Sequence, residues 1–243
     1  IHSSTNNTPS YTSLDSLRDF GDFEVEQQSK IRKLGAKNLS QSWTSIPHVT
    51  HFEEIDISII EEQRSELNKT SETKLTPLSY LVMKVISALQ EFPQFNAALV
   101  GEGEIMLRKY FNIGIAVDTK DGLLVPVIKE ADKLNITEVA NEIIMLAEKA
   151  KNKKLLEKNL SGGTFSISSL GPMGGVGFTP IINPPEVAIL GVSRAKKVPV
   201  LEGDKLVEKT ILPVALSYDH RVINGADAGK FMNFLKSEIE KGI

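Results

Sequence analysis

The stretch Ile211–Glu240, ILPVALSYDHRVINGADAGKFMNFLKSEIE, contains the clearest structural pattern in the chain. Ile211–Tyr218 is apolar and rich in β-forming residues, which predicts a strand. Polar residues and Asn224-Gly225 then mark a turn. From Ala226 to Glu240, apolar residues recur at helical spacing. The stretch therefore predicts a strand, a turn and an amphipathic helix.

Similar patterns extend over most of the chain. Further strands are predicted at Ile46–Glu53, Phe111–Val117, Leu123–Lys129, Thr164–Ser168, Val187–Val192 and Val198–Leu201. Helices are predicted at Phe23–Trp43, Ser58–Asn68, Leu78–Glu91 and Ile136–Ala150. Local signals support three of these elements, namely a capping box at Ser58, an N-cap with Pro at Thr76-Pro77, and a hairpin turn at Asp121-Gly122. Strands outnumber helices and alternate with them irregularly, so we expect an α+β two-layer sandwich, a mixed sheet with helices packed on it.

Composition excludes several classes of function. The chain has 243 residues, of which 41% are hydrophobic and 24% charged, as in typical globular proteins. It has no cysteine, so it has neither disulfides nor a thiol nucleophile. A net charge of −3 argues against binding to nucleic acid, and no apolar run approaches the ~20 residues of a membrane span.

The N-terminal residues differ in composition from the rest. Residues 1–20 begin with a Ser/Thr/Asn-rich stretch, which predicts a flexible linker. They lack the pattern of a signal peptide, and the sequence does not start with Met, so we expect a piece of a longer protein. Residues 21–243 are predicted to form a single catalytic domain.

Histidines are the first candidates for chemistry. His220 follows the predicted strand and precedes a turn, a place where site residues gather, although a lone histidine is more often structural. His48 and His51 are three residues apart on a predicted strand, so they point to opposite faces and are interpreted as structural. We predict no metal site, and His2 lies in the linker.

A glycine-rich segment, Asn159–Gly177, is the second candidate. Its glycines would allow a ligand to approach the backbone closely, and the alternative is a strand between glycine turns. No Gly-Lys-Ser/Thr follows, so the segment is not a P-loop.

Five motifs together resemble one known family. They are Ile46-Pro-His-Val-Thr-His-Phe52, Asp121-Gly-Leu-Leu-Val-Pro-Val127, Phe165-Ser-Ile-Ser-Ser-Leu-Gly171, Pro185-Glu-Val-Ala-Ile-Leu-Gly191 and Ser217-Tyr-Asp-His-Arg-Val-Ile-Asn-Gly-Ala226. Their order is that of the dihydrolipoamide acyltransferases, the cores of 2-oxo-acid dehydrogenase complexes. The stretch Asn38–Thr50 is most similar to the acetyltransferases of bacterial pyruvate dehydrogenase.

The resemblance implies the fold of chloramphenicol acetyltransferase, with trimers and active sites between subunits. It implies that His220 is a general base and that Ser168, from a neighbouring subunit, donates a hydrogen bond to the oxyanion. Ser169 is the adjacent alternative. Many members have Arg and Asp where this chain has Asn38 and Asn224. We therefore predict that Asn224 orients the histidine turn by hydrogen bonding, without acting as a carboxylate. The sequence leaves the role of Asp219 open, and a structural role is one alternative.

The resemblance also implies two thiol substrates, coenzyme A and a lipoyl group on an upstream domain. Residues Gly122, Leu123, Leu124 and Val125 resemble the segment that lines the coenzyme A channel. Arg194, Lys196 and Lys197 are candidates for its phosphates, since Arg can bind phosphate in bidentate fashion. Ordinary surface charge is the alternative for these three cations.

The family assembles into large cores, and its bacterial pyruvate dehydrogenase members favour a 24-mer built from homotrimers. The C-terminal Ile239–Ile243 is expected to anchor a neighbouring trimer, with fraying as the alternative. Decarboxylase and dehydrogenase subunits would bind through upstream domains. The expected location is the bacterial cytoplasm, or the mitochondrial matrix in a eukaryote. Alternatives for function are a succinyl, branched-chain or drug acyltransferase, and an inactive assembly core.

Overall fold

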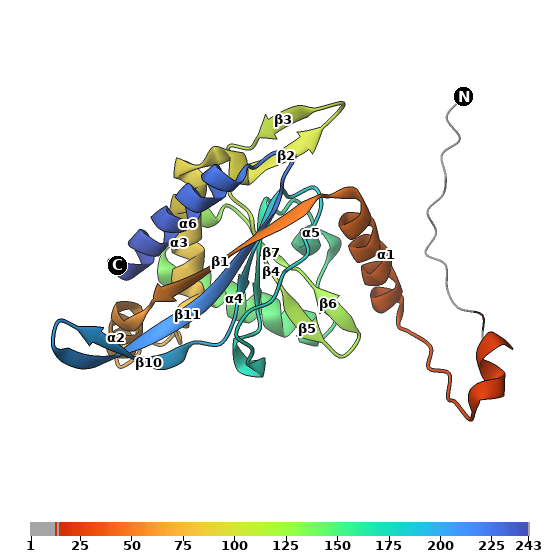
Figure 1. Cartoon of the computed structure of the whole chain (residues 1–243), viewed down its shortest axis with the longest axis horizontal. Coiled ribbons are helices and arrows are strands. Elements are labelled where there is room, and N and C mark those ends of the chain that lie inside the picture. The colour runs from red at the N-terminus through yellow and green to blue at the C-terminus, as the bar shows by residue number, and fades with distance from the viewer. Residues whose placement is uncertain (1–12, 14, 243) are drawn as a thin grey trace.

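A seven-stranded sheet organises the chain. The computed structural model describes residue 13 and residues 15–242. The strand order is β1-β11-β9-β8-β4-β7, and β10 pairs with β11. Figure 1 shows β1, β11 and β10 side by side. Strand β8 runs parallel to both of its neighbours, and the other pairs are antiparallel. The strands are β1 (His48–Asp56), β4 (Ile113–Ile115), β7 (Val127–Ile128), β8 (Phe165–Ser169), β9 (Ala188–Val192), β10 (Lys196–Glu202) and β11 (Lys205–Asp219).

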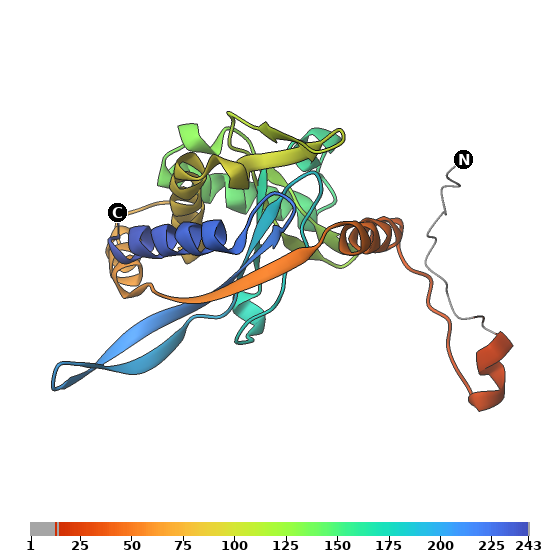
Figure 2. The same cartoon turned by 45° about the horizontal axis from the view of Figure 1, so that its top comes forward.

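Helices cover one face of this sheet, as Figures 1 and 2 show. The layer contains α2 (Ser58–Leu67), α3 (Pro77–Glu91), α4 (Ile136–Lys151) and α6 (Gly225–Glu240). Helix α1 (Lys30–Ser45) stands apart from this layer and contacts the small hairpin of β5 (Val117–Thr119) and β6 (Gly122–Leu124). A second hairpin joins β2 (Ala97–Val100) to β3 (Glu104–Leu107). Short elements are η1 (Asp15–Phe20), η2 (Pro93–Asn96), η3 (Ala131–Lys133), α5 (Glu157–Leu160) and η4 (Gly171–Met173).

Alternation along β11 explains why the helices lie on one face. Leu212, Val214, Leu216 and Tyr218 point into the core, where each is at most 3% exposed. Burying an aliphatic side chain of this size contributes roughly 1.5–3 kcal/mol. Phe231 of α6 lies in the same core. The strand and the helix at the C-terminal end of the chain are therefore packed into one core, and the turn between them is fixed at both ends.

A segment without regular structure crosses the other face of the sheet. Residues 174–183 run from η4 over β9, where Gly191 faces the rings of Phe178 and Pro180. A Cβ at Gly191 would lie only 2.9 Å from the Phe178 ring. Further along, Ile182 packs against Ile189 of β9. Glycine at position 191 therefore lets the segment lie directly on the sheet.

The predicted α+β class is confirmed, but the helix predicted over Phe23–Trp43 is wrong at its start. Helix α1 begins at Lys30, because the hydroxyl of Ser29 accepts a hydrogen bond from the Arg32 N–H and caps it. Residues 21–29 form no regular element. The apolar spacing before Ser29 thus did not indicate a helix.

The capping box predicted at Ser58 is also wrong. The N-cap of α2 is Ile57, and Ser58 is the first helical residue. The Ser58 hydroxyl donates to Asp56 and accepts from the N–H of Thr210. It therefore connects β1 and β11 and does not cap the helix.

The predicted hairpin near Asp121-Gly122 exists, but its strands are divided between two sheets. Strands β5 and β6 pair in their own small sheet, whereas β4 and β7 pair in the main sheet. Thr119 pairs with Gly122, so the turn is formed by Lys120-Asp121, one residue earlier than predicted. Gly122 has a φ of 133°, a conformation that favours glycine.

The two ends of the chain lie partly outside the described residues. This applies to residues 1–12 and 14 of the predicted linker and to Ile243 of the predicted anchor. Asp15–Phe20, also within the predicted linker, form η1. Within the described part, none of the helices is long and apolar enough to cross a membrane.

Candidate active site

His220 lies at the first position after β11, in the turn that leads to α6. Its backbone N–H donates to the carbonyl of Pro47, 3.1 Å away, which ties the turn to the start of β1. The residue is exposed, and its ring forms no hydrogen bond with the described residues. The ring of Tyr218 lies 6.0 Å from it, centroid to centroid. An exposed imidazole on a fixed backbone can accept a proton from a molecule that approaches it.

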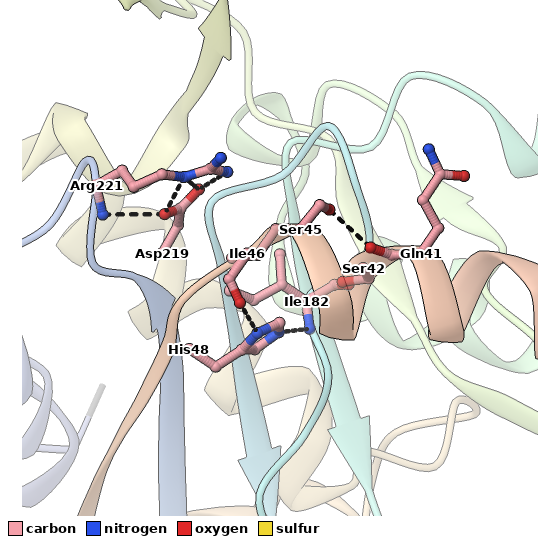
Figure 3. Close-up of polar contacts among 8 residues, drawn as sticks. All are labelled: Gln41, Ser42, Ser45, Ile46, His48, Ile182, Asp219 and Arg221. Carbon is pink, nitrogen blue, oxygen red and sulfur yellow. Dashed lines mark hydrogen bonds and ion pairs between the residues drawn. The ribbon is translucent and has the colours of Figure 1, made fainter. Parts of the chain in front are cut away.

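The neighbours of His220 form an ion pair that sequence reasoning did not foresee. Asp219 is 2% exposed, and its carboxylate accepts from the Nε and Nη2 of Arg221 at 2.9 and 2.6 Å (Figure 3). Hydrogen bonding to Asp219 raises the pKa of Arg221 above its ordinary value. The sequence left the role of Asp219 open, and the structure places its carboxylate in an ion pair with the residue that follows His220.

Asn224 does not contact the histidine turn through its side-chain oxygen. That oxygen accepts from the N–H of Asp227 at 2.9 Å and caps α6. The predicted hydrogen bond between Asn224 and the turn is therefore not formed by this atom. No hydrogen bond of its amide nitrogen to the described residues is seen, and the side chain is exposed. Asn224, four residues after His220, fixes where α6 begins.

Ser168 lies near the end of β8, in the middle of the sheet. It is half-buried, and its hydroxyl forms no hydrogen bond with the described residues. The adjacent Ser169 hydroxyl faces its own turn and accepts from the N–H of Gly171 at 3.4 Å. Neighbouring residues on a strand point to opposite faces. Ser168 therefore presents the freer hydroxyl of the two.

Within one chain, Ser168 is far from His220. Ser168 is in register with Gly191, which is in register with Ala215 of β11. The two strand steps span about 10 Å, and the five residues from Ala215 to His220 span about 17 Å. The two side chains are therefore roughly 19 Å apart by strand geometry. They can meet only if they come from different copies of the chain.

Residues predicted to line the coenzyme A channel lie on the Ser168 side. Gly122, Leu123 and Leu124 form β6, and Val125 follows it. A Cβ built on Gly114 of β4 would meet both the Val125 side chain and the Ser166 hydroxyl. The predicted channel segment therefore adjoins β4 and β8 and is remote from the His220 turn of the same chain.

The three cations predicted for phosphate binding differ in their contacts. Arg194 is exposed and follows β9 by two residues, close to the end of β8. Lys196 binds Glu54 at 2.7 Å, and Lys197 binds Glu208 at 2.6 Å. A phosphate would therefore compete with a carboxylate at both lysines. Arg194 has no ion pair to the described residues.

Glu186 is a titratable group that sequence reasoning missed. It precedes β9, it is 3% exposed, and burial raises the pKa of its carboxyl to about 7. Asn183 donates to its Oε1 at 3.4 Å, whereas its Oε2 has no hydrogen bond with the described residues. Arg108, itself 5% exposed, favours the charged form by its positive charge. Glu186 follows two prolines in the sequence, but nothing in the local sequence indicated that its carboxyl is buried.

A hollow of about 390 Å³ separates α1 from the His220 turn. Asn38 and Gln41 of α1 line one side, and Asp219 and Arg221 line the other. Asn38 and the Asp219–Arg221 ion pair therefore line the same hollow.

Both ring nitrogens of His48 contact backbone groups of the same chain (Figure 3). Its Nδ1 lies 2.9 Å from the carbonyl of Ile46, and its Nε2 lies 3.0 Å from the N–H of Ile182. The second contact requires Nε2 to accept, so Nδ1 carries the proton and donates. His51 lies 3.9 Å from Glu53 on the same strand. Among the described residues, no cluster of three or more His, Asp or Glu side chains could hold a metal ion.

Comparison with known proteins assigns the chain to a family. A family model described as the catalytic domain of 2-oxoacid dehydrogenases acyltransferase matches residues 20–242. The chain belongs to this family. The acetyltransferase components of the pyruvate dehydrogenase complexes of Cupriavidus necator and Pseudomonas aeruginosa are each 47% identical to it, over 88% and 87% of this chain. The chain spans 39% and 40% of the lengths of these two relatives.

Solved structures of the family have the same fold. The dihydrolipoamide acetyltransferase of Azotobacter vinelandii is 43% identical, covers 96% of this chain and 97% of its own, and has a TM-score of 0.91. The cubic core of a pyruvate dehydrogenase multienzyme complex is 44% identical with the same coverage and TM-score. A chloramphenicol acetyltransferase at 14% identity covers 84% of this chain and 94% of its own, with a TM-score of 0.55. The family and the fold predicted from the sequence are confirmed.

Proposed function

We propose that this chain transfers an acetyl group between the thiol of dihydrolipoamide and the thiol of coenzyme A. Relatives named as acetyltransferases of the pyruvate dehydrogenase complex support the acetyl group, at 43–47% identity over most of the chain. The strongest support is positional. The study of the Azotobacter vinelandii enzyme concerns a serine, a histidine and an asparagine in its catalytic mechanism, and their sequence intervals equal those between Ser168, His220 and Asn224.

The proposed chemistry begins with the proton of the attacking thiol. A thiol with an ordinary pKa near ~8.5 is mostly protonated at neutral pH, and the thiolate is the nucleophile. The ring of His220 accepts that proton as the sulfur attacks the thioester carbonyl carbon. The new C–S bond gives a tetrahedral oxyanion. When the original C–S bond breaks, His220 returns the proton to the departing sulfur.

The oxyanion needs a hydrogen-bond donor in the same place. The Ser168 hydroxyl fits this role because it forms no hydrogen bond with the described residues and lies half-buried on β8. Removing one such donor costs about 3 kcal/mol in the barrier. Since Ser168 and His220 of one chain are remote, the proposal requires a site between two copies, as in a homotrimer.

The two substrates would reach this site from separate directions. Coenzyme A would lie along Gly122–Val125, with Arg194 as the candidate for its phosphates. The lipoyl group would come from an upstream domain, as would contacts with decarboxylase and dehydrogenase subunits. The cubic core among the solved relatives supports a 24-mer. The relatives described above are bacterial, which favours the cytoplasm over the mitochondrial matrix.

A substrate panel tests this proposal. Acetyl-, succinyl- and isobutyryl-CoA are each incubated with dihydrolipoamide and the protein. We expect turnover with acetyl-CoA to exceed the other two. Preference for succinyl- or isobutyryl-CoA would assign another acyl group, and no turnover with any of them would indicate an inactive core.

The absence of an acyl-enzyme is a second test. Direct attack predicts that no acetyl group is attached to the protein during turnover. Intact-protein mass spectrometry after incubation with acetyl-CoA alone checks this. An acetylated Ser168 would contradict direct transfer.

A further inference from the structure

The backbone around His220 forms a closed turn. The carboxylate of Asp219 accepts from the N–H of Arg221 at 3.0 Å, which makes His220 the central residue of an Asx-turn. The carbonyl of Asp219 accepts from the N–H groups of Val222 and Ile223 at 3.0 and 2.9 Å. Asp219 thus holds the three residues that follow His220 through its backbone and its side chain.

The Arg221 side chain also binds the Asp219 carboxylate, from the solvent-exposed side of the turn. Its guanidinium donates through Nε and Nη2 to the carboxylate that already accepts its backbone N–H. Such forked, charge-assisted contacts are stronger than neutral hydrogen bonds and fix a geometry. Asp219 is 2% exposed, whereas the Arg221 side chain is 44% exposed. Because a buried carboxylate without a partner is unfavourable, the pair keeps the turn closed.

The position of the His220 ring depends on this turn. In the described residues, no side chain forms a hydrogen bond with the ring. Its location is therefore set by the backbone, which is held by Pro47 on one side and by the Asp219–Arg221 pair on the other.

The amides in this region cannot replace the ion pair. The oxygen of Asn224 is used to cap α6. Asn38 faces Asp219 and Arg221 across the hollow but forms no hydrogen bond with either of them. The charges that hold the turn therefore come from the two residues that flank the histidine.

We propose that Asp219 and Arg221 are positioning residues for His220, holding its imidazole where a substrate thiol can deliver a proton. The proposal rests on the function proposed above, which gives His220 that role. A displacement of about 1 Å can cost roughly 100-fold in rate, so a loosened turn should be visible in kcat.

The test compares D219N, R221Q and R221K in the intact assembly. We expect D219N and R221Q to lower kcat by about 10- to 100-fold with KM changed less than about two-fold, because the substrates still bind. R221K should fall between them and the wild type, since it keeps the charge but loses the fork. The double variant D219N/R221Q should be no worse than the poorer single variant.

K69Q is the matched control. It removes an exposed ion pair of similar length, Lys69 with Glu66 at 2.5 Å, at the C-terminal end of α2. Its kcat should stay within about two-fold of the wild type, because an exposed pair contributes little.

Hydrogen exchange provides a readout that does not need activity. Peptides covering residues 219–224 should exchange faster in D219N and R221Q than in the wild type and K69Q. Wild-type kcat in D219N and R221Q, or unchanged exchange alongside a lowered kcat, would overturn the proposal. If the wild type fails to acetylate dihydrolipoamide, the proposed function fails, while the exchange rates still show whether the pair holds the turn.

Discussion

The His220 turn and the Ser168 strand place their functional side chains by different means. Ser168 belongs to a strand between two parallel neighbours, so the ladder of backbone hydrogen bonds fixes it. His220 lies just beyond a ladder, and its turn depends on side chains, chiefly Asp219 and Arg221. A donor placed by a sheet therefore needs little local support. A base placed on a turn needs support from the residues beside it.

The sheet also separates the two side chains of the proposed site within one chain. The sheet keeps Ser168 and His220 of one chain roughly 19 Å apart, by the spacing of its strands. In the proposed mechanism, each chain would therefore contribute the base of one site and the hydroxyl of another. The fold is suited to a site shared between copies.

Replacing the base should have the largest effect. H220A should lower kcat by about 10³-fold or more, because the variant loses the proposed acceptor of the thiol proton. Steady-state assays with acetyl-CoA and dihydrolipoamide measure this. H51A, which changes a histidine on β1 with only a long contact to Glu53, should remain near the wild type. Wild-type turnover in H220A would remove His220 from the mechanism.

Removing the hydroxyl should have the next largest effect. S168A should lower kcat by about 10²- to 10³-fold, the usual loss for one oxyanion donor. S169A should change kcat far less, because that hydroxyl faces its own turn. A larger loss of kcat in S169A than in S168A would show that the donor is Ser169, one residue further along the chain.

The buried carboxyl of Glu186 should make stability depend on pH. It stays neutral up to about pH 7 when folded, whereas an ordinary carboxyl ionises near 4.5, so the folded chain binds the extra proton between these values. Its contribution to stability is therefore full below about pH 4.5 and is lost as the pH rises through about 7. E186Q cannot ionise and should gain stability relative to the wild type over this window, on the order of 3 kcal/mol.

Thermal unfolding of E186Q and the wild type from pH 5 to pH 8 measures this gain. E102Q, on the exposed turn between β2 and β3, is the control and should follow the wild type. If the difference in Tm between E186Q and the wild type did not change with pH, a raised pKa at Glu186 would be contradicted.

The cap of α6 should give the smallest effect. N224A should destabilise the protein by about 1 kcal/mol, because the N–H of Asp227 loses its acceptor. N224D should keep the cap and most of the stability, since an aspartate oxygen can accept the same bond. Denaturant unfolding measures both, and equal stability of N224A and N224D would show that the cap contributes nothing.

Sequence patterns predicted the parts of the fold that depend on periodicity. A continuous apolar run located the second half of β11, which is buried from Leu212 to Asp219, and helical spacing located α6, which buries one face. The predicted start of α1 was wrong because the apolar spacing begins before Ser29, the residue that caps the helix. The split of the hairpin at residues 113–128 depends on which sheet each half joins, and local sequence does not contain that information.

The site was predictable in part for similar reasons. His220 was a candidate because it follows an apolar strand, and catalytic roles for His220 and Ser168 were predicted only from motifs that resemble a known family. The Asp219–Arg221 contact depends on the shape of one turn, and the burial of Glu186 depends on how a loop packs against β8. Both are tertiary properties, so no local pattern indicated them.

Complementation between two inactive variants tests the shared site most directly. H220A and S168A are expressed together so that mixed assemblies form, and kcat is compared with that of each variant alone. A site built from two copies predicts recovery of about a quarter of wild-type activity, because random mixing gives that share of interfaces both an intact His220 and an intact Ser168. No recovery in assemblies shown to be mixed would contradict a site in which the base and the hydroxyl come from different chains.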